Sequence, residues 1–429
     1  MHAALDLNLL DPSQLRAARD VASRLHTAGH RGLIVGGAVR DLALGRCPKD
    51  LDMVSKATPE EIESLFERTL GVGRAFGVMI VQIAGQEVEL ATFRVDGSYS
   101  DGRRPDDVVY GDSLELDAER RDFTCNALYL DPLNGEVLDP TGGLQDLSQS
   151  LLRTVGDPAR RFREDGLRLL RMVRFEASHG LRPAPKLHAA ARAEARNLAR
   201  VSPERVLQEY LRTFAAPHPE RAYSSLAACE LIAPSLPNSL AHGELRAQAL
   251  AALPSPEEHA EWLPQPALLA LSILIEPKPL APLAAAGPEL ESALLALRPS
   301  KQVLATCVQL AELRRELSRL AQTPIDRPTH IRTLRNPLAQ PALSLTRAWA
   351  TAQADSGLAQ ALDELEDWSK RERPNFHPAQ LLSPRELMAA GVSPGPRLGQ
   401  ILRELEDAQL RGEIQDVEQA YSWLSLRDC

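Results

Sequence analysis

The sequence has few aromatic residues, no closely paired cysteines and no apolar run long enough to cross a membrane. Phe, Trp and Tyr make up 4% of its 429 residues, so the core must consist mainly of aliphatic side chains. The five cysteines are scattered without a CxxC motif, which predicts reduced thiols in the cytoplasm and argues against structural zinc. Apolar runs such as QPALLALSILIEP are too short for a membrane span, and the first residues lack the basic start of a secretory signal. We therefore expect a cytoplasmic protein that does not contact membranes.

Charge is unevenly distributed along the chain. The formal net charge of −9 by itself argues against a nucleic-acid partner. Residues 158–214, however, contain thirteen Lys and Arg and only six Asp and Glu, a local excess of +7. A basic segment in an acidic chain predicts localised binding of phosphate groups.

The hydrophobic pattern changes character near residue 158. Before it, Asp11 and Pro12 are typical of a helix start, GLIV at 32–35 predicts a buried strand, and DLDMV at 50–54 predicts a second. Further short strands are expected at 78–84 and 87–95, and a polar loop at 97–113. Beyond residue 158 the pattern is helical almost without interruption. These signals predict an α+β fold, with a mixed α/β head of about 150 residues and an all-helical remainder.

A pair of carboxylates and a glycine turn carry the first chemical signal. Asp50 and Asp52 lie two apart in the predicted strand, so both should point to one face. Hard oxygen ligands without neighbouring His or Cys favour Mg²⁺ over zinc. Upstream, GGAVRD predicts a strand–turn–helix in which Gly36 and Gly37 let the backbone approach a phosphate while Arg40 adds a cation. The combination is the layout of a nucleotidyltransferase that binds a triphosphate against two metal ions.

Five segments, in order, resemble the conserved blocks of the bacterial class II tRNA nucleotidyltransferases, the family of CCA-adding enzymes and poly(A) polymerases. The segments are GGAVRDLALGRCPKDLDMV, RRDFTCNAL, LDPTGGLQDL, REDGLRLLRMVRF and SPERVLQEYLRTF. The resemblance is dense over residues 30–215 and weaker beyond. It implies a small mixed-sheet nucleotidyltransferase head at 1–150, followed by a helical neck at 151–215, a helical body at 216–330 and a helical tail at 331–429.

The resemblance also implies a reaction and its partners. A member of this family adds C residues, A residues or both to the 3′ end of tRNA from CTP and ATP, with Mg²⁺ as cofactor and without a template. The RNA 3′-hydroxyl attacks the α-phosphate and pyrophosphate leaves. Arginines of the neck, body and tail would follow the phosphates of the tRNA acceptor and T arms. The sequence does not predict an oligomeric state.

Roles for individual residues follow from the same resemblance. Gly36, Gly37 and Arg40 would hold the triphosphate, and Arg121 would contact the nucleotide. Asp50 and Asp52 would bind the metal ions, with Glu89 as the best candidate for a third carboxylate. Asp165 and Arg168 would read the base, and Arg171 and Arg174 would line the same pocket.

Hydrogen-bonding chemistry explains how this last group could select a base. Cytosine and adenine both present an exocyclic amino group beside a ring-nitrogen acceptor. The Asp165 carboxylate can accept from the amino group while Arg168 donates to the acceptor, whereas uracil and guanine present a carbonyl oxygen instead. A single helix over 164–175 could thus accept CTP and ATP and reject UTP and GTP. The alternative for this segment is an ordinary solvated helix face, which is common among arginine-rich amphipathic helices.

Several family members remain compatible with the sequence. The loop between the first two blocks has the full length associated with addition of the terminal A, which disfavours an enzyme that adds only CC. CCA addition, A addition alone and poly(A) synthesis are not separated. No His-Asp dipeptide occurs, which argues against an additional phosphohydrolase domain. Two other classes compete with this interpretation. The intact glycine and aspartate motifs argue against a non-catalytic RNA-binding protein, and the basic neck argues against a small-molecule nucleotidyltransferase.

Overall fold

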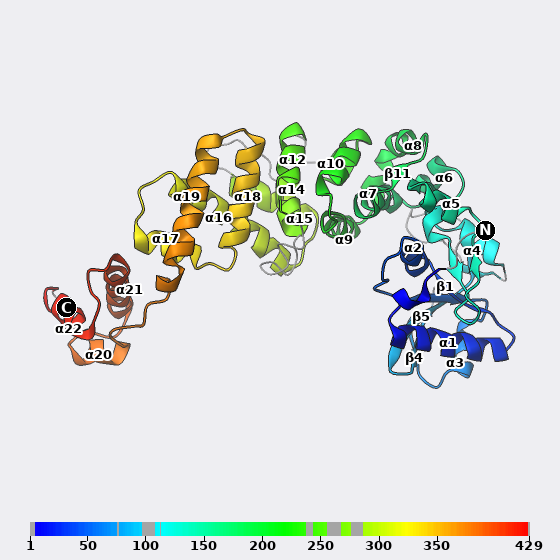
Figure 1. The fold of residues 1–429 in the computed structure, drawn as a ribbon, viewed down its shortest axis with the longest axis horizontal. Helices are drawn as coiled ribbons and strands as arrows, with labels where there is room; N and C mark the ends of the chain where they lie inside the picture. The colour runs from blue at the N-terminus through cyan, green and yellow to red at the C-terminus, as the bar shows by residue number, and fades with distance from the viewer. Residues whose placement is uncertain are drawn as a thin grey trace. The chain divides into compact units, whose positions relative to one another are not determined.

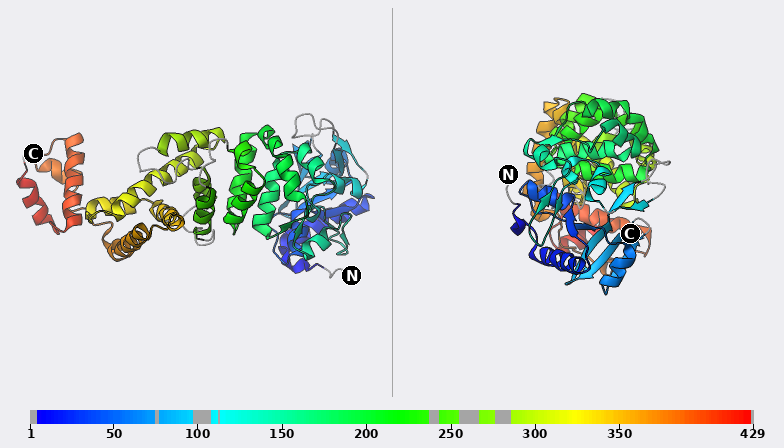
Figure 2. Two further views of the ribbon diagram at one scale, coloured as in Figure 1. Left: turned by 90° about the horizontal axis from the view of Figure 1, so that it is seen from above. Right: turned by 90° about the vertical axis from the view of Figure 1, so that its right-hand side faces the viewer.

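The computed structural model describes residues 5–74, 77–96, 108–111, 113–236, 243–254, 267–275 and 286–427. A mixed sheet occupies the N-terminal part, and helices make up nearly all of the described chain after it, which confirms the predicted α+β class (Figures 1 and 2). The chain divides into two compact units, Met1–Pro237 and Asn238–Cys429. The finer division at residues 150, 215 and 330 stays a prediction. No helix in the described part of the chain combines the length and apolar character that a membrane span needs.

Seven strands form the sheet of the first unit, in the order β3-β4-β5-β2-β1-β8-β9. Their bounds are β1 Gly32–Val35, β2 Asp52–Ser55, β3 Thr69–Gly73, β4 Val78–Ile83, β5 Gln86–Thr92, β8 Tyr129–Leu130 and β9 Val137–Leu138. Strand β1 pairs antiparallel with β2 and β8, and the central strand β2 runs parallel to β5. The segment predicted as a loop at 97–113 lies partly outside the described residues. Its described portion includes β7 (Val108–Tyr110), which pairs with β6 (Arg94–Asp96).

Local sequence signals set the first helices as predicted. Helix α1 (Pro12–Thr27) begins after Asp11, whose carboxylate accepts from the backbone N–H groups of the first turn. Its apolar stripe is buried, and the helix contacts β1, β4 and β5. Helix α2 (Gly37–Ala43) follows the glycine turn directly, and α3 (Pro59–Leu65) starts with a capping box between Thr58 and Glu61.

Short helices then lead from the sheet into the basic segment. They are α4 Leu114–Glu119, η3 Thr124–Asn126, α5 Gly143–Ser148, α6 Pro158–Glu164, α7 Leu167–His179, α8 Leu187–Ala193, η4 Ala195–Arg200, α9 Pro203–Phe214, α10 Pro219–Ala228 and α11 Ile232–Ser235. Strands β10 (Leu151–Leu152) and β11 (Arg182–Pro183) pair in parallel beside them. Helix α7 packs against α9 and α10, so the arginine-rich helix belongs to the core of the first unit rather than standing free in solvent.

The described residues of the second unit form helices and the turns that connect them, with no strand among them. It contains α12 Gly243–Ala251, α14 Ala267–Ile275, α15 Ala286–Ala296, α16 Lys301–Ala321, α17 Arg327–Leu334, α18 Ala339–Ala352, α19 Ser356–Glu372, α20 Pro384–Ala389, α21 Pro396–Arg411 and α22 Val417–Ser425. Helix α16 packs against α18 and α19. The last three helices share a small apolar core of their own, which includes Leu387, Ile401 and Leu424. Ion pairs from Arg332 and Arg335 to Glu406 join α17 to α21.

Three predicted element boundaries are wrong, and two of the errors fall at the site. The strand expected at 87–95 is divided into β5, which ends at Thr92, and β6, which begins at Arg94 in a separate sheet. The strand expected at 50–54 begins only at Asp52, because its partner β1 ends at Val35, which pairs with Asp52. Asp50 therefore lies in irregular backbone before the strand. The single helix expected over 164–175 is two helices, since α6 ends at Glu164 and α7 begins at Leu167. Asp165 lies between them in extended backbone.

Candidate active site

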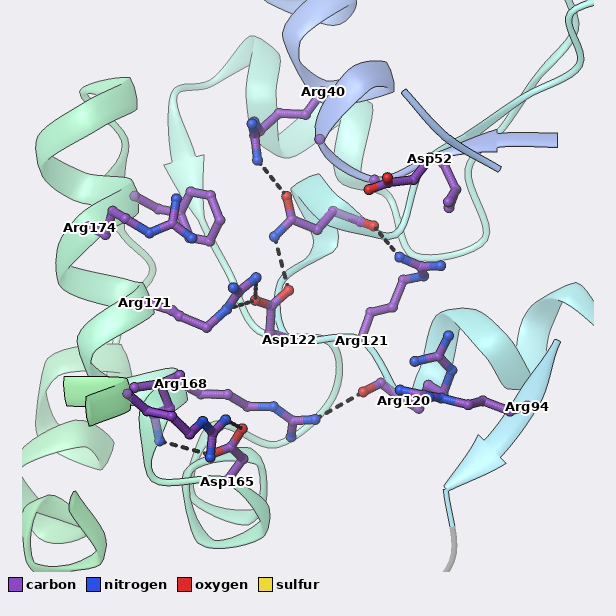
Figure 3. A pocket seen from close by; sticks show the side chains of 17 residues that line it. Arg40, Asp52, Arg94, Arg120, Arg121, Asp122, Asp165, Arg168, Arg171 and Arg174 are labelled. Carbon is purple, nitrogen blue, oxygen red and sulfur yellow. Dashed lines mark hydrogen bonds and ion pairs between the residues drawn. The ribbon is translucent and has the colours of Figure 1, made fainter. Parts of the chain in front are cut away.

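A pocket of about 440 Å³ in the first unit gathers most of the predicted site residues (Figure 3). Its walls come from the end of β1, the start of α2 and β2, the RRD segment, α7 and α9. The charged residues that line it are eight arginines and three aspartates: Arg40, Arg94, Arg120, Arg121, Arg168, Arg171, Arg174, Arg205, Asp52, Asp122 and Asp165. Such an excess of cations suits a ligand with several negative charges.

Two glycines, Gly36 and Gly37, line the pocket with backbone atoms alone. Gly36 has φ +71°, ψ −122°, a conformation that residues with a Cβ rarely adopt. A Cβ at Gly36 would lie 3.6 Å from Nη1 of Arg121, and a Cβ at Gly37 would lie 3.6 Å from Nη2 of Arg40. A side chain at either glycine would therefore contact a guanidinium group that lines the pocket.

The carboxylates lie at the adjoining edge of the sheet. Asp52 stands opposite Glu89 in the parallel register of β2 and β5. Burial raises the pKa of Asp52, and the nearby charge of Asp50 raises it further, while Arg121 opposes both effects. Burial and then the charge of Asp52 raise the pKa of Glu89. Asp52 is thus electrostatically coupled to both other acids and to Arg121.

The three acids differ in which hollow of the surface they line. Asp52 lines the main pocket, and Asp50 and Asp52 together line an adjoining hollow that also contains Gly37 and Arg40. Glu89 lines neither. Within the described ranges, no three His, Cys, Asp or Glu side chains are arranged so that they could hold a metal ion together. Asp50 and Asp52 share this hollow and could hold a cation there, and a role for Glu89 as a third carboxylate stays a prediction.

Arg121 is held in the pocket wall by a buried acid. Its Nη2 and Nε donate to Oδ2 of Asp117 on α4, at 2.9 and 3.2 Å. Its guanidinium also lies 5.3 Å from the ring centre of Tyr129, whose hydroxyl donates to the same Asp117 oxygen at 2.8 Å. Burial alone would lower the pKa of Arg121, but the Asp117 charge raises it, so this arginine stays cationic inside the wall.

Asp165 and Arg168 lie on the opposite wall, each with protein partners. Asp165 Oδ1 accepts from the backbone N–H of Leu167 at 2.9 Å, and Oδ2 accepts from Nη2 of Arg205 at 3.0 Å. Arg168 is 7% exposed, and its guanidinium donates to Glu164 Oε2 and to two backbone carbonyl oxygens. These contacts fix both side chains at the N-terminal end of α7, and Asp165 lies in the turn before the helix.

Arg171 and Arg174 surround an aromatic ring. Arg171 Nε donates to Asp122 Oδ2 at 2.6 Å, and Arg174 Nε donates to Glu209 Oε1 at 2.5 Å. The guanidinium carbons of Arg174, Arg40 and Arg171 lie 4.5, 5.2 and 5.6 Å from the ring centre of Phe175. Cation–π attraction and acid pairing together offset the repulsion among these three cations.

The structure adds residues that the sequence reasoning did not name. They are Arg94, Arg120, Asp122, Asn126, Phe175 and Arg205. Asp122 and Asn126 belong to RRDFTCNAL and Arg205 to SPERVLQEYLRTF, so family resemblance marked their segments. Neither periodicity nor spacing shows that these side chains turn toward the pocket, since the contacts they make are distant in sequence.

Comparisons with known proteins support the resemblance inferred from the sequence. Residues 33–153 match the family described as the poly A polymerase head domain, and residues 180–241 match the probable RNA and SrmB-binding site of polymerase A. The CCA-adding enzyme of Bacillus pumilus is 42% identical over 207 residues, which are 48% of this chain and 52% of that protein. The CCA-adding enzyme of Geobacillus stearothermophilus is 40% identical over 210 residues, with similar coverage. These alignments span about half the length of the curated relatives.

Solved structures extend the similarity over nearly the whole chain. The Bacillus stearothermophilus CCA-adding enzyme in complex with CTP has a TM-score of 0.75 and 28% identity, covering 97% of this chain and 98% of that one. The Thermotoga maritima CCA-adding enzyme complexed with tRNA has a TM-score of 0.67 over 96% of both chains, at 18% identity. The second similarity establishes a shared fold. The predicted resemblance to the tRNA nucleotidyltransferase and poly(A) polymerase family is thereby confirmed.

Proposed function

We propose that this chain is a template-independent nucleotidyltransferase that adds C and A residues to the 3′ end of tRNA, with CTP and ATP as substrates. The main observation behind the proposal is that one pocket is lined by Asp52 of β2, by several arginines and by Asp165. One nucleoside triphosphate could contact all three with its phosphates and base. The similarity to CCA-adding enzymes, one of them solved with CTP, supports the same function.

The phosphate side of the pocket would bind and orient the triphosphate. Gly36 and Gly37 let the backbone come close, and Arg40 and Arg121 supply charge from two sides. Arg121 stays protonated because Asp117 raises its pKa, so its contribution should not change across physiological pH.

The carboxylates fit a divalent cation. Asp50 and Asp52 offer hard oxygen donors, and the pKa of Asp52 is raised partly because its neighbour carries the same charge. A bound cation would remove that repulsion, so Asp50 and Asp52 would hold Mg²⁺. When bound, a pair of such ions activates the RNA 3′-hydroxyl and neutralises charge on the departing pyrophosphate. Glu89 would support Asp52 from the neighbouring strand.

The opposite wall would select the base. Each Asp165 oxygen already accepts one hydrogen bond, and a carboxylate oxygen can accept a second from an exocyclic amino group. The Arg168 guanidinium has five N–H groups, and three of them donate to protein oxygens. The other two could donate to the ring-nitrogen acceptor of cytosine or adenine. Arg171 and Arg174 complete the wall beside them. UTP and GTP would set a carbonyl against Asp165 and leave buried groups unpaired.

The test is incorporation of labelled CTP and ATP, separately and together, into tRNA transcripts that end in the discriminator base, in CC or in CCA. Addition of C to the bare end followed by a single A supports CCA addition. A single A on the CC end alone indicates an A-adding enzyme, and a long A tract indicates a poly(A) polymerase. No turnover that depends on an RNA 3′ end would indicate a non-catalytic RNA-binding protein or a small-molecule nucleotidyltransferase. A cytoplasmic location, and tRNA contacts by the helices beyond the pocket, form part of the proposal.

A further inference from the structure

A buried chain of hydrogen bonds joins the phosphate side of the pocket to its base side. Arg40 Nη1 on α2 donates to Oδ1 of Asn126 at 2.8 Å, and Asn126 Nδ2 donates to Oδ1 of Asp122 at 3.0 Å. Asp122 Oδ2 in turn accepts from Nε of Arg171 on α7 at 2.6 Å. Figure 3 draws this line of contacts from Arg40 through to Arg171. Arg40, Asn126 and Asp122 are each less than 10% exposed.

Asn126 lies in the middle of this hydrogen-bond chain, where it both accepts and donates through its side chain. Its neighbours are a cation on one side and a carboxylate on the other, so the position needs an acceptor and a donor at once. An amide supplies both, whereas Asp could not donate to Asp122 and Leu could do neither. The backbone oxygen of Asn126 also accepts from Nη1 of Arg121 at 3.4 Å. One residue thus contacts both arginines that flank the glycine turn.

The two ends of the chain also meet at Phe175. Its ring lies beneath the guanidinium groups of both Arg40 and Arg171, at 5.2 and 5.6 Å. Each of these two cations has a carboxylate partner of its own, since Asp122 pairs with Arg171 and Asp41 pairs with Arg40. Asn126 links Asp122 to Arg40 through its side-chain amide, while Asp41 Oδ1 accepts from Nε and Nη2 of the same arginine at 3.0 and 2.8 Å.

We propose that Asn126 is a positioning residue, which aims the Arg40 guanidinium at the phosphates of the bound nucleotide and, through Asp122, ties that arginine to Arg171. The inference rests on the proposed function for its substrate. Because phosphates are common to all nucleotides, loss of Asn126 should weaken binding of ATP and CTP equally. The preference for these nucleotides over UTP and GTP depends on Asp165 and should not change.

The experiment compares the full-length Asn126→Ala variant with wild type. We expect KM for ATP and for CTP to rise about ten- to a hundred-fold, as for loss of a hydrogen bond to a charged group. The CTP-to-UTP selectivity should stay within about twofold of wild type, since no base contact changes. Asn134→Ala, in an exposed turn that does not line the pocket, is the matched control and should leave KM unaltered. An unchanged KM in folded Asn126→Ala protein, or a selective change for one base, would overturn the inference.

A double-mutant cycle separates positioning from general structural support. If Asn126 acts through Arg40, then Asn126→Ala should have little further effect in an Arg40→Ala background. Additive effects would show that Asn126 acts elsewhere. Asn126→Ser, which keeps a small polar group, replaces the alanine variant if that protein does not fold.

Binding measurements distinguish a failure of this inference from a failure of the proposed function. If wild type adds neither C nor A to tRNA, the proposed function fails, but titration with ATP and with inorganic triphosphate still tests Asn126. Both ligands should bind more weakly to the variant by the same factor. Equal affinity of wild type and variant for inorganic triphosphate would contradict the positioning role.

Discussion

The Asp165 carboxylate accepts a hydrogen bond from the Arg205 guanidinium at 3.0 Å, although forty residues separate the two in the chain. Arg205 is on α9, and its Nη1 is buried in the same pocket without a hydrogen-bond partner in the structure. The residue proposed to accept from the base is therefore oriented by a helix that packs behind α7.

Arg205→Ala should reduce base selectivity, because Asp165 would lose the hydrogen bond that fixes its Oδ2 atom. We expect the ratio of kcat/KM for CTP to that for UTP to fall about tenfold. Arg212→Ala, an exposed arginine on the same helix, serves as the control. A ratio that equals wild type in the Arg205 variant would exclude this role.

Asp165→Ala should weaken discrimination against UTP and GTP more than it weakens metal binding. The reason is that the carboxylate distinguishes an amino group from a carbonyl, which can contribute on the order of 10²-fold or more. The check is single-nucleotide incorporation with each of the four nucleotides, together with a Mg²⁺ titration of activity. Unchanged selectivity against UTP and GTP would show that another group reads the base.

Asp50→Ala and Asp52→Ala should each abolish incorporation while the protein stays folded, and a chelator should do the same to wild type. Both residues retain solvent contact, so their removal leaves no cavity. The expected loss of rate follows from the loss of a metal ligand at the reacting phosphate. Asp20→Ala, on the exposed face of α1, is the control. Residual activity of either variant near the wild-type rate in excess Mg²⁺ would contradict the assignment.

Asp122→Asn should lower stability in a way that depends on pH. Burial alone would raise the pKa of Asp122, but the Arg171 charge and the hydrogen bonds from Asn126 and the Phe123 N–H hold it well below its ordinary value of 3.8. A carboxyl whose pKa is depressed by folding stabilises the protein above its unfolded pKa, and that contribution is lost as the pH falls toward the folded value. We expect the variant to be about 2 kcal/mol less stable at pH 7, with the difference shrinking below about pH 4. Denaturant unfolding at several pH values measures it, and a pH-independent difference would refute the argument.

Gly166→Ala should destabilise the turn that carries Asp165. Gly166 has ordinary helical φ and ψ, so the cost is steric rather than conformational. A Cβ there would lie 2.5 Å from the backbone oxygen of Asn197 and 3.1 Å from Val201. We expect a loss of about 1–3 kcal/mol and reduced base selectivity as α7 shifts. Gly399→Ala is the matched control, since a Cβ at that helical glycine meets no atom within 4 Å. If both variants were equally stable, close packing against Asn197 and Val201 would not be the reason that a glycine occupies position 166.

Sequence alone predicted the parts of this protein that depend on local chemistry. The cap at Asp11, the glycine turn before Arg40 and the succession of short strands and helices follow from side-chain hydrogen bonding, backbone freedom and apolar spacing. The spacing of Asp50 and Asp52 predicted a site for a metal ion, and the resemblance to a known family added the roles of Asp165 and the arginines of α7. The structure brings Asp52, Asp165 and these arginines to one pocket. It also leaves Glu89 beside Asp52 but outside that pocket.

Only the tertiary structure decided which partners these residues have. The spacing of Arg168, Arg171 and Arg174 shows that they share a helix, but not that Glu164, Asp122 and Glu209 neutralise them. Asp50 falls outside its predicted strand because strand length depends on the partner strand, which ends at Val35. Arg40 meets Asn126 across 86 residues of sequence. Such contacts depend on how the elements pack against one another, which the spacing of residues along the chain does not show.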